Sequence, residues 1–293
     1  MNILVLGVTG MLGSVVFKQF SNDARYQAWG TLRNASNLTF FPEQSHAFLL
    51  NNIDVSDHDA LVSVFDRIQP DVVINCVGLI KQLAYAKDPL STLPINAMLP
   101  HRLAYLCSLI NARLIQVSTD CVFNGRKGMY TEDDISDAED LYGKSKYIGE
   151  LHDLSHAVTL RTSIIGHELN SQTSLVDWFL SQTDIVKGYK KAIFSGLPTI
   201  ELADVIKDYV IPSTNLQGLY HVSVDPIDKY TLLNLIAKVY GKNVEIEVDE
   251  KIQIDRSLDS SRFQEITGYE PPNWPELIEK MYQEHLRNRA SHV

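Results

Sequence analysis

A glycine-rich turn near the start of the chain restricts its fold more than any other feature. An apolar run of strand length, Asn2–Leu6, ends at Gly7, and Gly10 and Gly13 follow before a helical pattern begins. Glycines at this spacing let the backbone approach a pyrophosphate, which the free N–H groups of the helix N-terminus can bind. The alternative is a turn that serves tight packing alone. The predicted dinucleotide site comprises Gly7, Thr9, Gly10, Met11, Leu12 and Gly13.

Strand-like and helical patterns alternate through the first half of the chain. Strand-like runs recur at Val72–Asn75, Leu114–Ser118 and Val158–Arg161, and helical stripes separate them. In one stripe, over residues 61–68, apolar side chains follow the i, i+3, i+4, i+7 spacing of a helix. Strands that alternate with helices form βαβ units. We therefore predict an α/β fold with a Rossmann-like, doubly wound parallel sheet.

The alternation weakens in the second half, where short helices such as Lys229–Tyr240 mix with strand-like pieces such as Leu219–Val222. We assign both pieces to a smaller C-terminal α/β domain. The predicted division is a dinucleotide-binding domain over residues 1–165 and a substrate-binding domain over 166–293. The chain is expected to re-enter the first domain around residues 195–215.

The end of the second predicted strand indicates which dinucleotide binds. A site for NAD usually has an acidic residue here for the ribose 2′-hydroxyl, whereas an arginine accommodates a 2′-phosphate. This chain has Arg33 and no acidic residue nearby, which favours NADP(H), with NAD(H) as the alternative; Arg33 could also be an ordinary surface side chain. Asp54 could bind the adenine amino group or cap the following helix.

Two further patterns indicate carbonyl chemistry. Tyr142 and Lys146 are four residues apart, so on a helix they share one face. A neighbouring ammonium should lower the pKa of a phenol, which would make Tyr142 a plausible acid/base group. Thr119 follows a predicted strand, at the sheet edge where such folds bind ligands. Its hydroxyl could hold a substrate carbonyl oxygen.

Together these segments resemble the extended short-chain dehydrogenases/reductases, and most of all the group of nucleotide-sugar 4-ketoreductases related to dTDP-4-dehydrorhamnose reductase. The segments that carry the resemblance are Gly7–Gly13, Asn75–Gly78, Asn96, Ser118–Gly125, Tyr142–Lys146, Gly149–Glu150 and Leu160–Ser163, with weaker matches at Gly196–Thr199 and Arg256–Asp259.

The resemblance implies roles for individual residues. Thr119, Tyr142 and Lys146 would form a catalytic triad in which Tyr142 protonates the C4 alkoxide and Lys146 also binds the nicotinamide ribose. The other cofactor contacts that we expect, besides the glycine turn, are Arg33, Asp54, Val55, Cys76, Val77, Gly78 and Thr162. The expected substrate contacts are Lys81, Asp120, Cys121, Thr199 and Arg256.

The predicted reaction is NADPH-dependent reduction of the 4-keto group of a nucleotide-activated 6-deoxyhexulose, in the synthesis of surface polysaccharide precursors. The family pattern has tyrosine where this chain has Cys121, and often an aromatic residue where it has Ile164. These departures, with the segment from Ile80 to Leu83, favour UDP-2-acetamido-2,6-dideoxyhexos-4-ulose over dTDP-4-dehydrorhamnose as the substrate. Two alternatives stay open: a non-catalytic, NADP-binding regulatory subunit of the methionine adenosyltransferase type, and a nucleotide-sugar epimerase or dehydratase.

Composition limits the partners and the compartment. The chain has 26 Lys plus Arg against 36 Asp plus Glu, a net charge of −10, which argues against nonspecific binding to nucleic acid. Three cysteines among apolar neighbours, with no signal-peptide pattern and no long apolar run, suit a cytoplasmic protein that does not enter a membrane. We expect a monomer or a homodimer, and no metal site.

Overall fold

The protein is described here by a computed structural model that covers residues 1–80 and 84–290. Its centre is a seven-stranded sheet with the order β10-β6-β5-β4-β1-β2-β3, in which every neighbouring pair is parallel. The strand order changes direction between β1 and β4, the position where such sheets bind ligands. The predicted α/β fold is confirmed. The strands are β1 (Asn2–Leu6), β2 (Gln27–Thr31), β3 (Leu49–Leu50), β4 (Val72–Asn75), β5 (Arg113–Thr119), β6 (Ala157–Thr162) and β10 (Gly218–His221).

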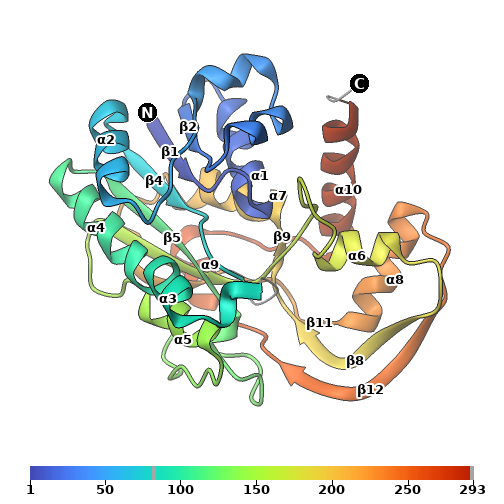
Figure 1. The fold of residues 1–293 in the computed structure, drawn as a ribbon. Coiled ribbons are helices and arrows are strands. Elements are labelled where there is room, and N and C mark those ends of the chain that lie inside the picture. The colour runs from blue at the N-terminus through green and yellow to red at the C-terminus, as the bar shows by residue number, and fades with distance from the viewer. Residues whose placement is uncertain (81–83, 291–293) are drawn as a thin grey trace.

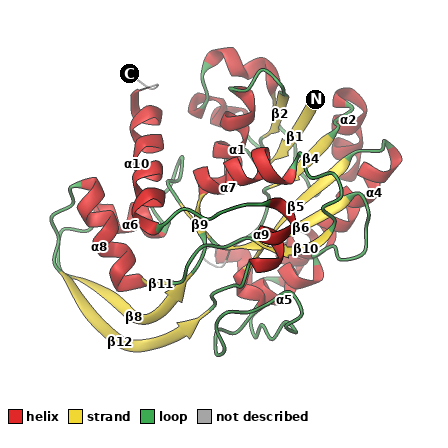
Figure 2. Ribbon diagram, turned by 180° about the vertical axis from the view of Figure 1, so that it is seen from behind, coloured by secondary structure: helices red, strands yellow, loops and turns green. Residues whose placement is uncertain are grey.

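Helices cover both faces of this sheet (Figure 2). Alternate residues of one strand join different cores, as the two-residue period of a strand requires. In β1, Ile3 packs in the core that contains helices α1 (Met11–Ser21) and α7 (Thr199–Val205), whereas Leu4 packs in the core of α2 (His58–Ile68) and α4 (Leu99–Leu109). The strands are therefore apolar on both faces.

The helical segment over residues 89–109 consists of three consecutive pieces. These pieces are α3 (Pro89–Thr92), a π-helical segment η4 (Leu93–Met98) and α4. Pro100 has no N–H with which to bond the carbonyl group of Asn96, four residues earlier. Gly149 packs so close to this carbonyl that a Cβ at residue 149 would overlap it. The π-helical segment places the Asn96 side chain beside the end of β4.

The strand expected over residues 219–222 lies in a different place from the one predicted. We assigned it to the smaller C-terminal domain, but β10 pairs in parallel with β6 and completes the central sheet. Its four residues are all buried, so a short apolar run at this point in the chain fits the edge of a covered sheet as well as a second core. The division of the chain at residue 165 stays a prediction.

Beside the sheet lies a unit built from the remaining chain, to the right in Figure 1. Its three-stranded sheet has the order β11-β8-β12, with β12 parallel and β11 antiparallel to β8. Strands β7 and β9 form a separate, parallel two-stranded sheet. The elements are β7 (Ile164–Ile165), α6 (Leu175–Ser181), β8 (Val186–Phe194), β9 (Leu197–Pro198), β11 (Ile227–Asp228), α8 (Lys229–Tyr240), β12 (Ile246–Asp255) and α10 (Trp274–Ala290).

Several shorter elements complete the described part of the chain. They are η1 (Ala35–Phe40), η2 (Glu43–Phe48), η3 (Ala84–Lys87), η5 (Asp120–Val122), α5 (Leu141–Ile148), η6 (Ile206–Val210) and α9 (Ser261–Thr267). None of the helices within the described ranges has the length and apolar character needed to cross a membrane.

Candidate active site

The glycine turn forms a tight cradle between β1 and α1. Gly7 has φ of +81°, a conformation that favours glycine, and a Cβ there would lie 2.8 Å from Cγ2 of Val77. A Cβ at Gly13 would overlap the carbonyl oxygen of Gly7. Gly10 is the N-cap residue of α1, and no side chain caps its N–H groups. A bare backbone at a helix N-terminus fits the pyrophosphate of a dinucleotide.

The residues expected to contact the adenosine end of the cofactor lie just after strands β2 and β3. The Thr31 hydroxyl accepts a hydrogen bond of 3.3 Å from the Gly7 N–H, which joins the ends of β1 and β2. Arg33 is exposed. Asp54 bonds the backbone N–H and the hydroxyl of Ser56, and these bonds, with the charge of Arg33, lower its pKa. The cap of α2 is Asp57 rather than Asp54, so Asp54 is left at the turn near Arg33.

The end of β4 is held by amide side chains. Asn75 donates to Oε1 of Gln116 at 2.8 Å and accepts from the Val77 N–H at 3.1 Å. Asn96 bonds both the N–H and the carbonyl oxygen of Leu79. These bonds fix the course of the backbone over Cys76, Val77 and Gly78, where we predict contacts with the cofactor; Val55 is buried, and Thr162 bonds the Ser163 carbonyl oxygen.

The structure brings the three predicted catalytic residues together. Thr119 is the last residue of β5, and Tyr142 and Lys146 lie one turn apart on α5. The Thr119 side chain is hydrogen-bonded to Tyr142. The Lys146 ammonium donates to the Val117 carbonyl oxygen at 2.7 Å, and a Cβ at Gly78 would lie 3.9 Å from it. Hydroxyl, phenol and ammonium groups thus meet at the carboxyl edge of the sheet, next to the end of β4.

The protonation of this group differs from the sequence-based expectation. Burial raises the pKa of Tyr142 above its usual value, and the neighbouring Cys121 and Asp120 act in the same direction. The hydrogen bond with Thr119 only partly opposes this rise. Burial also lowers the pKa of Lys146 to about 8. The expected lowering of the tyrosine pKa by Lys146 is therefore wrong for the protein alone, because desolvation outweighs the neighbouring charge.

A second group of side chains adjoins the triad. We name it the cation cluster: Asp120, Cys121, Lys229 and Arg256. Arg256 donates to the Phe123 carbonyl oxygen at 2.7 Å and lies 3.7 Å from Sγ of Cys121. Burial raises the pKa of Asp120, against the charges of Arg256 and Lys229. Three of these residues were predicted to contact substrate, and Lys229 was not.

Two predicted substrate residues are not part of this group. Thr199 is 1% exposed at the start of α7, where it packs against Gly166 and offers little surface to a ligand. Lys81 lies outside the described residues. Their contacts with substrate stay predictions.

A buried ion pair behind the triad was not assigned a role from sequence. Glu150 accepts two hydrogen bonds from Arg161, of 2.8 and 2.6 Å, and one of 2.6 Å from the Ser118 hydroxyl. Both charged side chains are almost fully buried. The ring of His221 bonds Arg161 on one side and the Tyr130 carbonyl oxygen on the other. Within the sequence, only the resemblance at residues 150 and 161 indicated these positions.

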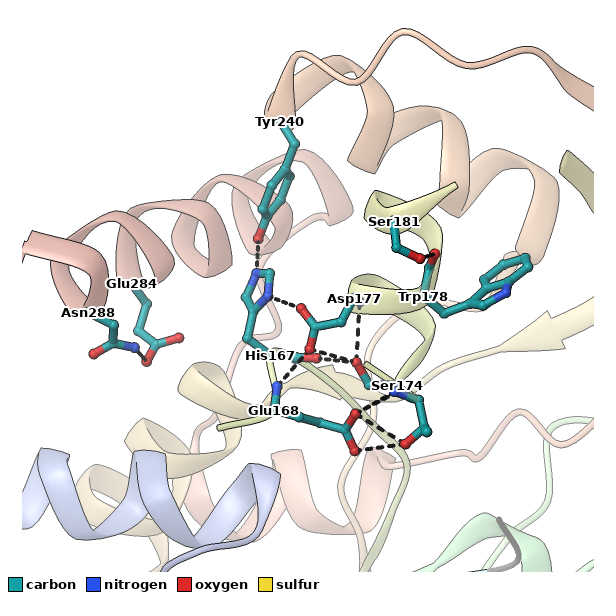
Figure 3. Close-up of polar contacts among 11 residues, drawn as sticks. His167, Glu168, Ser174, Asp177, Trp178, Ser181, Tyr240, Glu284 and Asn288 are labelled. Carbon is teal, nitrogen blue, oxygen red and sulfur yellow. Dashed lines mark hydrogen bonds and ion pairs between the residues drawn. The ribbon is translucent and has the colours of Figure 1, made fainter. Parts of the chain in front are cut away.

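Another polar cluster binds the helices of the second unit to one another (Figure 3). The His167 ring bonds Asp177 of α6 at 2.5 Å and the Tyr240 hydroxyl of α8 at 2.9 Å. It also stacks on His285 of α10, with ring centroids 3.9 Å apart. The Ser174 N–H donates to the Glu168 carboxylate, and the Ser174 hydroxyl donates to the Gly166 carbonyl oxygen. The cluster links α6, α8 and α10, and we assign it a structural role.

One family model matches almost the whole chain. Residues 1–287 match the family described as the RmlD substrate binding domain. Methionine adenosyltransferase 2 subunit beta of Danio rerio is 32% identical over 253 residues, which span 82% of this chain and 74% of that protein. The dTDP-4-dehydrorhamnose reductase of Aggregatibacter actinomycetemcomitans is 23% identical over 305 residues, or 95% and 97% of the two chains.

A solved structure has the same fold. The dTDP-4-dehydrorhamnose reductase of Bacillus anthracis, crystallised in complex with NADP, superposes with a TM-score of 0.78 at 21% identity, over 97% of this chain and 98% of the other.

Proposed function

The chain belongs to the RmlD substrate binding domain family, and from that premise we propose that it reduces the 4-keto group of a nucleotide-activated 6-deoxyhexulose with NADPH. The observation that carries the proposal is the meeting of Thr119, Tyr142 and Lys146 at the sheet edge beside the glycine cradle. Relatives named as dTDP-4-dehydrorhamnose reductases support it.

The cofactor would lie along the carboxyl edge of the sheet. The backbone of Gly7, Gly10 and Gly13 would hold the pyrophosphate, and Arg33 would pair with the 2′-phosphate that distinguishes NADP(H). The exposed position of Arg33 leaves its guanidinium available for this. NAD(H) stays the alternative, because a flexible arginine does not exclude a ribose hydroxyl.

The residues of the triad account for the proton in the reduction. When bound, NADPH supplies a hydride to the carbonyl carbon. Thr119 holds the carbonyl oxygen, where negative charge develops, and Tyr142 gives its proton to that oxygen, so that the ketone becomes an alcohol. The raised pKa of Tyr142 keeps the phenol protonated at neutral pH, as a proton donor requires. Lys146 then offers a cation close to the phenolate that remains.

The preferred substrate is a UDP-linked 2-acetamido-2,6-dideoxyhexos-4-ulose. Cys121 and Ile164 are smaller than the aromatic residues of the family pattern, which leaves more room beside the sugar. A dTDP-linked 4-keto-6-deoxyhexose is the other candidate. Either product would serve as a precursor of surface polysaccharide.

The test is NADPH oxidation with both sugar nucleotides by the wild type and Tyr142→Phe. Loss of the proton donor should lower kcat by roughly 10²–10⁴-fold, whereas the Kd of NADPH, measured by fluorescence titration, should change little. Equal rates for the two proteins would exclude Tyr142 as the acid. Silence of the wild type with each sugar, while NADPH still binds, would refute the reductase.

A second candidate is supported by the identity to methionine adenosyltransferase 2 subunit beta. In that case the chain would bind NADP and regulate a partner enzyme without turning over a sugar. The silent outcome above, together with NADP-dependent co-purification with a methionine adenosyltransferase, would favour it. Turnover of a sugar nucleotide without net NADPH oxidation would instead indicate an epimerase or dehydratase.

A further inference from the structure

We propose that Lys229 contacts the substrate and donates a hydrogen bond to an oxygen of the sugar beside the carbonyl group that is reduced. This inference rests on the proposed function and names a specificity-determining residue for it. Lys229 is the first residue of α8, 110 positions along the chain from Thr119, and only the fold brings the two regions together.

The ammonium group of Lys229 lacks a protein acceptor. Its Nζ lies 4.5 Å from the centre of the Phe194 ring, which fixes the direction of the side chain. Across the described residues, no carboxylate lies within 4.0 Å of it and no oxygen accepts a hydrogen bond from it. By contrast, Lys190 and Lys191, on the strand beneath α8, pair with Asp228 and Glu250.

The placement of this lysine is unfavourable in two respects. Burial of its side chain lowers the pKa of Lys229, so the protein solvates the charge poorly. A cation in the first turn of a helix also opposes the helix dipole. The side chain is half-buried, and a poorly solvated cation with no carboxylate partner marks a place where a ligand can provide one.

The neighbours of Lys229 place it at the sugar. The groups close enough to act on its ammonium are Asp120 and Cys121, the two residues that follow Thr119. Since Thr119 is the residue that would hold the carbonyl oxygen, the cation faces the reacting end of the substrate. Arg256 lies on the other side of Cys121, 3.7 Å from its sulfur atom.

The two cations suit different groups of the substrate. A guanidinium binds a diphosphate in a bidentate manner, whereas an ammonium is a compact charge that suits single hydroxyl or carbonyl oxygens. With Asp120 as the one acidic group of the cation cluster, the cluster can bind an oxygen-rich sugar through donors and an acceptor together. Arg256 already bonds the Phe123 carbonyl oxygen, whereas Lys229 donates to no oxygen of the described residues.

The experiment compares the wild type, Lys229→Met and Lys190→Met by calorimetry. The probes are NADPH, UDP alone, and the product-like UDP-2-acetamido-2,6-dideoxyhexose, with dTDP and dTDP-rhamnose as the second pair. We expect Lys229→Met to weaken binding of the sugar nucleotide at least tenfold, and to leave the Kd of NADPH and of the free nucleotide unchanged. The control Lys190→Met removes an exposed, paired lysine and should match the wild type.

Thermal melting separates this role from a structural one. Removal of a half-buried charge that has no carboxylate partner should leave the Tm almost unchanged, and Lys229→Gln should behave in the same way. Unchanged sugar-nucleotide affinity in Lys229→Met would overturn the inference, and so would equal weakening of free UDP, which would place the lysine at the diphosphate. If the wild type binds neither sugar nucleotide, the proposed function itself fails, an outcome that differs from a defect of the variant alone.

Discussion

At the scale of single residues, the glycine cradle depends on close backbone approaches that leave no room for a Cβ atom. Gly13 faces the carbonyl oxygen of Gly7 across the first turn of α1, and Gly10 bonds that same oxygen through its N–H at 3.0 Å. The three glycines therefore differ: positions 7 and 13 are sterically closed, whereas a Cβ at position 10 would meet its nearest atom at 3.4 Å.

This difference predicts unequal effects of two alanine substitutions. Gly13→Ala should lower the free energy of unfolding by about 2 kcal/mol or more, because the added methyl group forces backbone atoms apart. Gly10→Ala, whose backbone φ of −79° suits any residue, should cost below about 1 kcal/mol. Urea unfolding of both variants measures this, and equal losses would contradict the assigned packing.

The residues that sequence predicts well are those whose partners lie nearby in the chain. The glycine turn and the Tyr142–Lys146 pair are local patterns, and their geometry follows from strand, turn and helix. The pKa of Tyr142 and the position of Lys229 depend on burial by distant segments, which spacing cannot show. A lysine in the first turn of a helix was the available signal for Lys229.

At the scale of elements, the carboxyl ends of β5 and β6 are joined through one carboxylate. Glu150, just after α5, bonds Ser118 of β5 and Arg161 of β6. The ion pair therefore holds α5, which carries Tyr142 and Lys146, against the strand that carries Thr119. The geometry between the catalytic groups on β5 and α5 therefore depends on the bonds of Glu150.

Breaking this buried pair should destabilise the protein strongly. Glu150→Gln leaves Arg161 charged and buried, and we expect a loss of about 3–5 kcal/mol in unfolding free energy. Lys191→Met is the matched control: its pair with Glu250 is exposed, with side-chain exposures of 49% and 58%, and should contribute less than about 1 kcal/mol. Similar losses in the two variants would mean that the buried pair is not an integral part of the fold.

Elements were predictable to different degrees. Strands buried on both faces, such as β4, are continuous apolar runs with clear limits. The four residues of β10, Gly218–His221, are likewise all buried, but the sheet to which they belong is decided by pairing with β6 across a long insertion. The change to a π-helical segment before α4 follows from Pro94 and Pro100, which cannot donate backbone hydrogen bonds.

At the scale of the whole molecule, His221 joins the central sheet to the loops that surround the site. Its Nδ1 atom donates to the Tyr130 carbonyl oxygen, and Nε2 accepts from Arg161, at 3.0 and 3.1 Å. Burial, together with the charge of Arg161, lowers the pKa of His221 to about 3. The folded protein thus requires the neutral ring, in one tautomer.

Stability should therefore fall in acid. The unfolded chain binds a proton at His221 below pH 6.5, while the folded protein resists it down to about pH 3. Above pH 6.5 the neutral His221 ring makes its full contribution to the free energy of unfolding. Below pH 6.5 the free energy of unfolding falls by about 1.4 kcal/mol per pH unit, because the unfolded chain gains the proton first.

Between pH 7.5 and 5, urea unfolding of His221→Gln should lose about 2 kcal/mol less stability than the wild type does. His58→Gln, at an exposed position, should follow the wild type. Parallel curves for all three proteins would show that His221 does not control the acid response.

The return of the chain to form β10 has a consequence for how this protein can be divided. Helix α7, which packs on α1, and β10, which flanks β6, both come from residues after 198. A fragment that stopped at residue 165 would leave the flank of β6 bare and one side of α1 uncovered. Segments of the two units alternate along the polypeptide, so no single cut in the chain separates one unit from the other.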